Sequence, residues 1–318
     1  MKLVIGFITY NNITAKYLPY FLKSVYQQSF RDFKIIAIDN SENKNNSNIK
    51  YIEKNYPEIK IEWAGKNIGF ARAYNKMIDK AIKIGAEYFL VINPDIILDK
   101  NAFKILIDKI SLNKNLSSVC PKILKWDFEN NKKTNIIDTY GIQLKTGLKF
   151  IDVGQGGIDN NKSNNIKILG PSGACGLYRL SALKKIKKNN QYFDELMFMY
   201  KEDCDLAYRL SLAGYESECV NNAIAYHDRT VKAKGQGNIK IAVNRKNKSK
   251  QSKKWSFLHQ QIIFIKYWNL QNFKNKLAII LYEIKMIVFI LLFEQYLLAQ
   301  FLELCKIKNS IYIYKKNN

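Results

Sequence analysis

The chain has 318 residues, of which 47% are hydrophobic, and this is enough to bury the core of one large domain with an appendage, or of two smaller domains. Its five cysteines are scattered, without a close pair or a cysteine–histidine cluster, which argues for a reducing compartment and against a structural metal. The formal net charge is +24, and the last 90 residues hold 18 Lys and Arg against three acids. Such a charge attracts either nucleic acid or the cytoplasmic leaflet of a membrane, unless it only solubilises the chain.

Strands and helices alternate over the first 115 residues. Residues 2–9 are apolar and lack the cleavage site of a signal peptide, so we expect a first strand there, then a helix over residues 14–28 with Thr14 as its N-cap. A loop rich in Asn, Lys and Ser is expected after Ser41. The further expected strands are 33–38, 59–63 and 88–92, and the further helices are 67–84 and 101–112. This alternation predicts an α/β fold with a doubly wound, mainly parallel sheet.

Residues 88–92 are all apolar or aromatic, which predicts a strand buried on both faces. Pro94 cannot continue a central strand and holds Asn93 extended, so Asp95 should lie just past the carboxyl end of the strand. Ligands bind at that edge of open α/β sheets. A carboxylate there suits Mg²⁺ or Mn²⁺ bridging a substrate diphosphate, although a simple polar turn would read the same way.

Polar residues follow each of the first four expected strands, namely Thr9 with Asn11, Asp39, Asn67 and Asp95. They would converge on one rim of the sheet. An acid at the second strand end can accept hydrogen bonds from a ribose or a base, and backbone N–H groups at the Asn67 helix start can face phosphate. A nicotinamide enzyme is disfavoured because the loop after the first strand, residues 9–14, contains no glycine.

Residues 117–169 mix short apolar pieces with glycine and asparagine, which indicates irregular β-structure. Residues 170–176 are mostly small and lead into a further strand. They would let the backbone pass close to a bulky ligand, or they form a tight turn.

Three acids, Glu202, Asp203 and Asp205, follow an aromatic segment and open an amphipathic helix. The helix dipole favours acids in the first turn, so capping is one interpretation. On a helix, Glu202 and Asp205 share a face and Asp203 is rotated away, so one carboxylate can face a substrate while Asp205 pairs with Arg209.

The chain has two histidines, in different contexts. A strand expected at residues 219–226 leads to His227, which is the better ligand candidate because it lies at a strand end. His259 lies within the apolar stretch 255–268, where a packing role is expected.

The C-terminal region combines charge and apolarity. Residues 232–254 are basic, and residues 255–268 and 276–304 are strongly apolar. Residues 286–302 fall short of the roughly 20 apolar residues of a membrane span. We therefore expect helices at the membrane interface, with Trp255 and Trp268 near headgroup depth; a helical hairpin packed on the rest of the chain or on another subunit is the alternative.

These motifs in this order resemble the family 2 glycosyltransferases with the GT-A fold, and most closely their rhamnosyltransferase-like branch. The resemblance covers residues 1–230. The segments that carry it are Thr9-Tyr10-Asn11, Asp39-Asn40-Ser41, Asn67 to Asn75, Asn93-Pro94-Asp95, Gly173 to Gly176, Phe193-Asp194-Glu195, Tyr200 to Arg209, and His227.

The resemblance implies a role for each matching residue. Asp95 matches the second acid of the family's D-x-D motif, with Asn93 in place of the first, and is expected to bind a divalent cation, Mg²⁺ or Mn²⁺, together with His227. Asp203, in the Glu202-Asp203 pair, matches the catalytic base. His227 with Thr230 and Lys232 resembles the family's H-x-x-S/T segment. The expected donor-binding residues are Thr9, Tyr10, Asn11, Asp39, Asn67, Gly69, Arg72, Asn75 and Asn93.

The resemblance implies a GT-A catalytic domain over residues 1–230, divided into a nucleotide-sugar half (1–115) and an acceptor half (116–230). A basic linker (231–254) and a helical C-terminal region (255–318) would follow. The implied activity is inverting transfer of a sugar, rhamnose being one candidate, from a nucleoside diphosphate donor to a saccharide or lipid-linked acceptor.

This hexosyltransferase-type reaction would serve cell-surface polysaccharide synthesis at the inner face of the cell membrane, without a nucleic-acid partner. A sugar-phosphate nucleotidyltransferase is one alternative, but the glycine-rich basic N-terminal loop usual in such enzymes is absent. A basic nucleic-acid-binding protein is the other.

Overall fold

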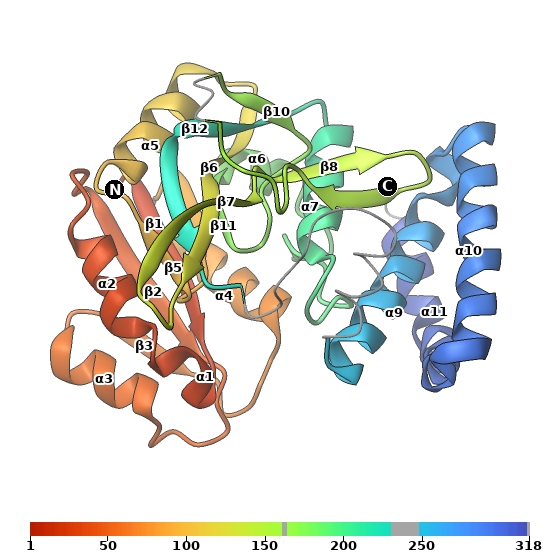
Figure 1. Cartoon of the computed structure of the whole chain (residues 1–318), viewed down its shortest axis with the longest axis horizontal. Coiled ribbons are helices and arrows are strands. Elements are labelled where there is room, and N and C mark those ends of the chain that lie inside the picture. Colours follow the sequence, from red (N-terminus) through yellow and green to blue (C-terminus); the bar gives the residue numbers. More distant parts are fainter. Residues whose placement is uncertain (161–163, 230–247, 317–318) are drawn as a thin grey trace.

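The computed structural model describes residues 1–160, 164–229 and 248–316. Its centre is a ten-stranded sheet (Figure 1). Eight strands follow the order β10-β12-β6-β11-β4-β1-β2-β3, and off this path β5 pairs with β12 and β7 pairs with β6. The first half of the sheet consists of β1 (Leu3–Thr9), β2 (Phe33–Asp39), β3 (Lys60–Trp63) and β4 (Tyr88–Ile92). These four strands are parallel, with β1 between β2 and β4, as the alternation of elements predicts.

The second half of the sheet is mixed. It contains β5 (Ile96–Leu98), β6 (Leu116–Asp127), β7 (Lys132–Thr139), β10 (Ile166–Ile168), β11 (Cys175–Arg179) and β12 (Glu216–His227). Strand β11 runs antiparallel to both β4 and β6, whereas β12 runs parallel to β6. A separate hairpin of β8 (Ile142–Lys145) and β9 (Lys149–Asp152) accounts for the rest of the irregular β-region.

Helices cover both faces of the sheet and are drawn with their labels in Figure 1. They are α1 (Asn11–Ala15), α2 (Leu18–Tyr26), α3 (Ser47–Asn55), α4 (Phe70–Lys83), α5 (Ala102–Leu112), α6 (Leu180–Lys185) and α7 (Glu202–Leu212). Apolar residues of α2 and α5, such as Phe21 and Phe103, join one core cluster with β1 and β4. Residues of α4 and α7, such as Met77 and Leu206, join a second cluster on the other face.

Two local predictions are wrong in the N-terminal region. The helix expected at 14–28 is divided into α1 and α2, because Pro19 starts a new helix, and Thr14 lies inside α1, where its Oγ1 accepts from the Tyr10 backbone N–H at 2.9 Å. The polar loop expected after Ser41 contains α3. Asn46 caps this helix by accepting from two backbone N–H groups, and Ile52 buries its apolar side.

The C-terminal region is helical and consists of α9 (Lys250–Tyr267), η1 (Trp268–Leu270), α10 (Phe273–Phe293), η2 (Gln295–Leu297) and α11 (Ala299–Lys316). Helix α9 begins inside the stretch expected as a linker, most of which, with Thr230 and Lys232, lies outside the described residues. Ile262 and Ile263 of α9 pack with Tyr208 of α7 and Leu148 of the hairpin. Helix α10 lies on the side away from the sheet (Figure 1). In the described part of the chain, no helix is long and apolar enough to cross a membrane.

Candidate active site

Asp95 lies at the carboxyl end of β4, whose five residues are all buried. The Asn93 N–H donates to the Ala174 carbonyl at 2.9 Å, and the Asp95 carbonyl accepts from the Asp228 N–H at 3.1 Å, so the backbone is tied on both sides of Pro94. The Asp95 Oδ2 atom is 3.3 Å from His227 Nε2. Its Oδ1 atom is buried and has no hydrogen-bond partner among the described residues.

His227 ends β12 and lies between two carboxylates. Its Nδ1 is 2.8 Å from Asp138 Oδ2 at the end of β7, and its Nε2 faces Asp95. Arg229 extends this row of charges, with Nε 3.3 Å from Asp138 Oδ1 and Nη1 3.0 Å from Asp152 Oδ2. Burial alone would lower the pKa of His227, but the carboxylates of Asp95 and Asp138 outweigh burial and raise this pKa to about 10.

Asp138 lies in the middle of this row, between His227 and Arg229, and carries negative charge. Its carboxylate is fully buried, and burial alone would raise its pKa. The neighbouring charges of Arg229 and His227 outweigh burial and lower the pKa of Asp138 below its ordinary value. The buried Asp138 carboxylate therefore fixes the orientation of the His227 ring.

Asp203 lies in the first turn of α7. Its Oδ2 accepts from the Gly173 N–H at 2.9 Å and its Oδ1 accepts from the Cys204 N–H at 2.8 Å. Glu202, beside it, is buried, and burial followed by the charge of Asp203 raises the pKa of Glu202 well above its ordinary value. Asp205 is fully buried and pairs with Arg209 at 2.8 Å, which confirms that expected pair.

The segment Gly173-Ala174 joins the two acidic positions. Ala174 binds the backbone just before Asp95, and Gly173 binds the carboxylate of Asp203. A Cβ atom at Gly173 would lie 3.3 Å from Phe70 and 3.5 Å from Asp203 Oδ2, so the small residue permits this close approach. The structure therefore brings Asp95, His227 and Asp203, which are far apart in sequence, to one end of the sheet.

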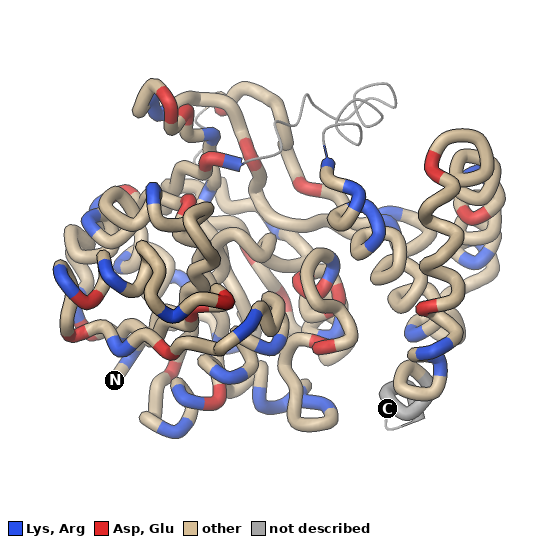
Figure 2. The backbone as a smooth tube through the Cα atoms, turned by 90° about the horizontal axis from the view of Figure 1, so that it is seen from below, with Lys and Arg blue, Asp and Glu red and all other residues tan. Residues whose placement is uncertain are grey.

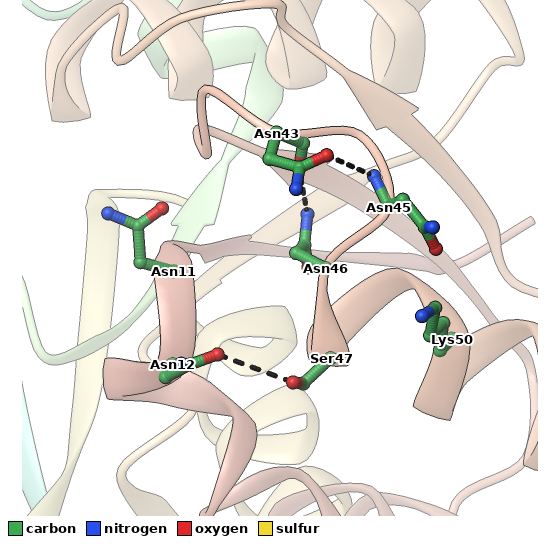
Figure 3. A pocket seen from close by; sticks show the side chains of 7 residues that line it. All are labelled: Asn11, Asn12, Asn43, Asn45, Asn46, Ser47 and Lys50. Carbon is green, nitrogen blue, oxygen red and sulfur yellow. Dashed lines mark hydrogen bonds between the residues drawn. The ribbon is translucent and has the colours of Figure 1, made fainter.

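The ends of β1 and β2 form a second, polar part of this edge. The Asp39 carboxylate is fully buried and accepts from Thr9 Oγ1 at 2.6 Å and from Asn46 Nδ2 at 2.9 Å, as well as from Ser41. Chain groups thus already occupy the acid expected to bind ribose or base. Beside it lies an open hollow of about 510 Å³ (Figure 3). Its lining is Asn11, Asn12, Asn43, Asn45, Asn46, Ser47 and Lys50.

The start of α4 contributes unequally to the edge. Asn67 Oδ1 accepts from the Gly69 N–H at 3.0 Å and so shapes the turn before the helix. Arg72 is exposed and donates to Glu195 at 2.8 Å. Asn75 is buried, and its amide oxygen and nitrogen bind the backbone of Phe193, so it holds the segment before α7 against α4.

The sequence model described as Glycosyl transferase family 2 matches residues 5–187, more than half of the chain. This chain belongs to glycosyl transferase family 2. The match includes Asp95 and the polar edge at the ends of β1 and β2, while Asp203 and His227 lie beyond its end. No curated protein sequence matches the chain.

The fold of this family member is of the GT-A type, and one solved structure with a TM-score above 0.5 agrees with it. The structure of GalNAc-T7 with UDP, GalNAc and Mn²⁺ superposes with a TM-score of 0.56 at 14% identity, covering 71% of this chain and 44% of that one. S. aureus TarS gives a TM-score of 0.48 at 18% identity, covering 72% and 37%. TarS 1-349 in complex with UDP gives 0.47 at 19% identity, covering 71% and 60%. The chain thus spans between 37% and 60% of the length of these structures, less than two thirds in each case.

The side-chain atoms of Asp95 and His227 in this glycosyl transferase family 2 member fit a divalent cation. Asp95 Oδ1 is buried without a hydrogen bond among the described residues, and Asp95 Oδ2 lies beside an imidazole nitrogen. Carboxylate oxygen suits both Mg²⁺ and Mn²⁺, and an imidazole nitrogen suits Mn²⁺ once the cation has displaced its proton. Within residues 1–160, 164–229 and 248–316, no group of three or more His, Cys, Asp and Glu side chains is placed to hold a metal. Substrate oxygens would have to complete the coordination.

Three charged residues of the site were not predicted from the sequence. Asp138 contacts His227, and Arg229 links Asp138 to Asp152; the two acids lie in the β-region whose sequence indicates only irregular strands. One signal was present: Asp138 follows two isoleucines at the end of a strand, and a buried acid in such a position requires a charged partner. The partner itself is 89 residues away.

Proposed function

We propose that this family 2 member is an inverting glycosyltransferase, which moves a sugar from a nucleoside diphosphate donor to a saccharide or lipid-linked acceptor. The observation that carries the proposal is that Gly173-Ala174 joins Asp203 and Asp95 at one end of the sheet. Such a transfer requires one carboxylate that holds a cation at the diphosphate and a second carboxylate that accepts the proton of the acceptor hydroxyl.

Asp203 is the proposed general base, with Glu202 beside it in the catalytic pair. An acceptor hydroxyl is a weak nucleophile at neutral pH, and a carboxylate within hydrogen-bond reach accepts its proton as attack begins, which contributes about 10²–10⁴-fold. Asp203 is half-buried and fixed by two backbone N–H groups, whereas Glu202 is buried. Attack opposite the leaving group inverts the anomeric carbon without a second nucleophilic carboxylate.

Asp95 and His227 are the proposed cation ligands at the diphosphate. When bound, the cation supplies Lewis-acid stabilisation of the charge that develops on the leaving diphosphate. Asp138 and Arg229 orient His227, and Arg229 adds a positive charge to the same end of the sheet. The Mn²⁺ named for GalNAc-T7 supports this assignment.

The donor nucleoside is assigned to the edge formed by β1, β2 and α4. Amide side chains both donate and accept hydrogen bonds, as the edge of a base requires. Of the expected contacts, Asn11 lines the hollow. Asp39 accepts hydrogen bonds from Thr9 and from Asn46, and Asn46 also lines the hollow. The remaining expected donor contacts are Tyr10, Asn67, Gly69, Arg72, Asn75 and Asn93. UDP in the GalNAc-T7 structure supports a uridine diphosphate sugar as the donor, and rhamnose is one candidate for the sugar.

The membrane is the proposed site of action, in cell-surface polysaccharide synthesis on the cytoplasmic side. Helix α10 exposes a continuous apolar stripe in which each side chain is 43% to 54% exposed. Its members are Leu277, Ile280, Leu281, Ile284, Ile287, Val288 and Leu291. Lys274 and Lys285 lie along one margin of this stripe, an arrangement that suits a helix lying in an anionic interface.

In the described residues, Lys and Arg are distributed over the sheet region and the C-terminal helices alike (Figure 2). This distribution favours a membrane contact through α10 over a dedicated nucleic-acid surface. Residues 1–230 are the proposed catalytic domain and residues 255–318 the membrane-binding region, with the 231–254 linker between them.

The test uses purified protein and a panel of UDP-, dTDP- and GDP-sugars with and without Mn²⁺. Binding to the native state should raise the melting temperature in the presence of the correct nucleotide. Incubation with a cell-envelope lipid extract should release nucleoside diphosphate. Release of pyrophosphate from a nucleoside triphosphate and a sugar phosphate would instead identify a nucleotidyltransferase.

A further inference from the structure

The turn before α7 has an unusual backbone. Tyr200 and Lys201 are consecutive non-glycine residues with φ of +72° and +76°. The left-handed region is unfavourable for residues with a Cβ atom, so other contacts have to hold both residues there. Asp203 follows Lys201 by two residues, so the backbone of this turn sets the direction in which its side chain points. Whatever holds the turn therefore also aims Asp203.

Helix α9 contacts this turn from one side. His259 Nδ1 is 2.7 Å from the Tyr200 carbonyl oxygen, and Tyr200 Oη is 3.2 Å from Ser252 Oγ. The rings of Phe198 and Trp255 are 5.0 Å apart. Three side chains of α9, on successive turns of the helix, thus hold residues 198–200.

The start of α4 contacts the same segment from the other side. The Phe70 N–H donates to the Phe198 carbonyl at 2.8 Å. Gly69, at φ +81°, packs so closely that a Cβ atom there would be 2.7 Å from that carbonyl oxygen. The segment that precedes the proposed base is therefore enclosed between a donor-side helix and the C-terminal helix.

Buried charges near the C-terminal end of α9 fix this helix against α7. The Asp205 carboxylate binds Lys266 and accepts from Tyr267 Oη at 2.7 Å, and Lys266 also binds Asp194 at 2.9 Å. Lys266, Asp205 and Asp194 are all buried. Because removal of one partner from a buried ion pair is costly, the register between the two helices is well defined.

His259 is 1% exposed, and burial lowers its pKa to about 4, while hydrogen bonds to the Tyr200 and Met199 carbonyls act in the opposite direction. The imidazole is therefore neutral at neutral pH. A carbonyl oxygen only accepts hydrogen bonds, so the proton of the neutral ring is on Nδ1 and is donated to Tyr200.

We propose that His259 is a positioning residue: by donating from Nδ1 to the Tyr200 carbonyl, it holds the left-handed turn and aims Asp203 at the acceptor hydroxyl. The inference rests on the proposed role of Asp203 as the base. It assigns a catalytic task to α9, which lies outside residues 5–187 matched by the family model. The C-terminal region then serves the chemistry as well as the membrane.

The test compares His259→Leu with His259→Asn, whose amide nitrogen lies near the position of Nδ1 and preserves the donor. Gln260→Leu is the matched control, because Gln260 lies on the same helix, is buried, and donates to a carbonyl of the β8–β9 hairpin, that of Leu148, at 3.2 Å. The probes are UDP, for binding, and the sugar nucleotide that is turned over fastest in the panel above.

His259→Leu should lower turnover by about tenfold to a hundredfold, since small misplacements of catalytic groups have effects of this size, and should leave UDP affinity within about twofold. His259→Asn should restore most of the turnover, and Gln260→Leu should keep it. Equal turnover in His259→Leu and Gln260→Leu would overturn the proposal, as would failure of His259→Asn to exceed His259→Leu.

Amide hydrogen exchange of residues 199–204 gives a readout that needs no substrate. Exchange should accelerate in His259→Leu and stay slow in His259→Asn; unchanged exchange in both would contradict the proposal. If His259→Leu does not fold, His259→Gln replaces it, because its longer amide cannot reproduce the Nδ1 position. If no sugar nucleotide is turned over by the unmodified chain, the proposed function fails, and hydrogen exchange still decides whether His259 holds the turn.

Discussion

The backbone N–H of Gly173 donates to Asp203 Oδ2 at 2.9 Å. This bond fixes the carboxylate in one orientation without neutralising it, which is what a proton acceptor requires. It also sets apart two substitutions of the same residue, because an asparagine oxygen can still accept from Gly173 and an alanine cannot.

Asp203→Asn can therefore keep the bond from Gly173, although its amide nitrogen cannot accept from the Cys204 N–H, and it loses the base. We expect transfer to fall by about 10²-fold or more while UDP binding is retained. Asp203→Ala should lose transfer and also loosen the turn at Gly173. Steady-state rates and UDP titrations measure both effects. Asp108→Asn, on the exposed side of α5, is the control, and transfer by Asp203→Asn at the rate of this control would show that the base is elsewhere.

Gly69→Ala should destabilise the chain far more than Gly85→Ala. Both glycines have positive φ, at the two ends of α4, so both substitutions introduce backbone strain of about 1 kcal/mol or more. Only at Gly69 does the new Cβ atom also meet a backbone carbonyl, that of Phe198, at 2.7 Å. Urea unfolding of the two variants measures the difference. Equal losses in both would mean that the contact with Phe198 is unimportant.

Asp138→Asn should weaken the proposed cation site. The variant leaves His227 without the carboxylate on its Nδ1 side, and loss of such a partner lowers metal affinity by about 10-fold to 100-fold. The measurement is the Mn²⁺ concentration that gives half-maximal transfer. Asp159→Asn, which breaks a buried pair with Lys122 at 2.6 Å outside the row of charges at His227, is the control for general destabilisation.

Acid should destabilise the chain through His259. Its pKa is lowered by burial from 6.5 to about 4 in the folded state, so folding favours the neutral ring. The associated stability is fully present above pH 6.5 and is lost as the pH falls toward 4, with a total of about 3 kcal/mol. Urea unfolding at pH 7, 5.5 and 4.5 should show a steeper loss in the unmodified chain than in His259→Asn. Parallel curves would contradict this assignment.

The apolar stripe on α10 should be required for binding to vesicles that contain anionic lipid. Ile284→Glu with Val288→Glu places two charges at its centre and should reduce binding by more than about tenfold. Leu112→Glu is the matched control, because Leu112 is 87% exposed but isolated on α5. Co-sedimentation with vesicles measures both. Undiminished binding by the double variant would exclude α10 as the contact.

The parallel half of the fold was predictable because its signals are local. The five apolar residues before Asn93 predict a strand buried on both faces, and Pro94 predicts where that strand ends. Helix α3 was not predicted, because its cap Asn46 and its few apolar residues are embedded in a polar stretch. Pro19 was present in the sequence, but its effect depends on whether the chain starts a second helix there, as it does.

The site was predictable where strand ends supply it and not where distant side chains do. Asp95 and His227 lie at the ends of strands that the sequence predicts, whereas Asp138, the partner of His227, lies at the end of β7, a strand that the sequence does not single out, 89 residues away. Asn75 illustrates the opposite case. Its position in a motif suggested the donor, but its amide is consumed by the backbone of Phe193, a contact that only the packing of α4 against that segment reveals.

The pairing of Lys266 with Asp194 and Asp205 has a practical consequence for anyone shortening the chain. A fragment cut near residue 230 would contain both acids and lack Lys266, so Asp194 would lose its lysine and Asp205 would keep only Arg209. A shortened chain that keeps these contacts has to extend through Tyr267, well past residue 187, where the family match ends.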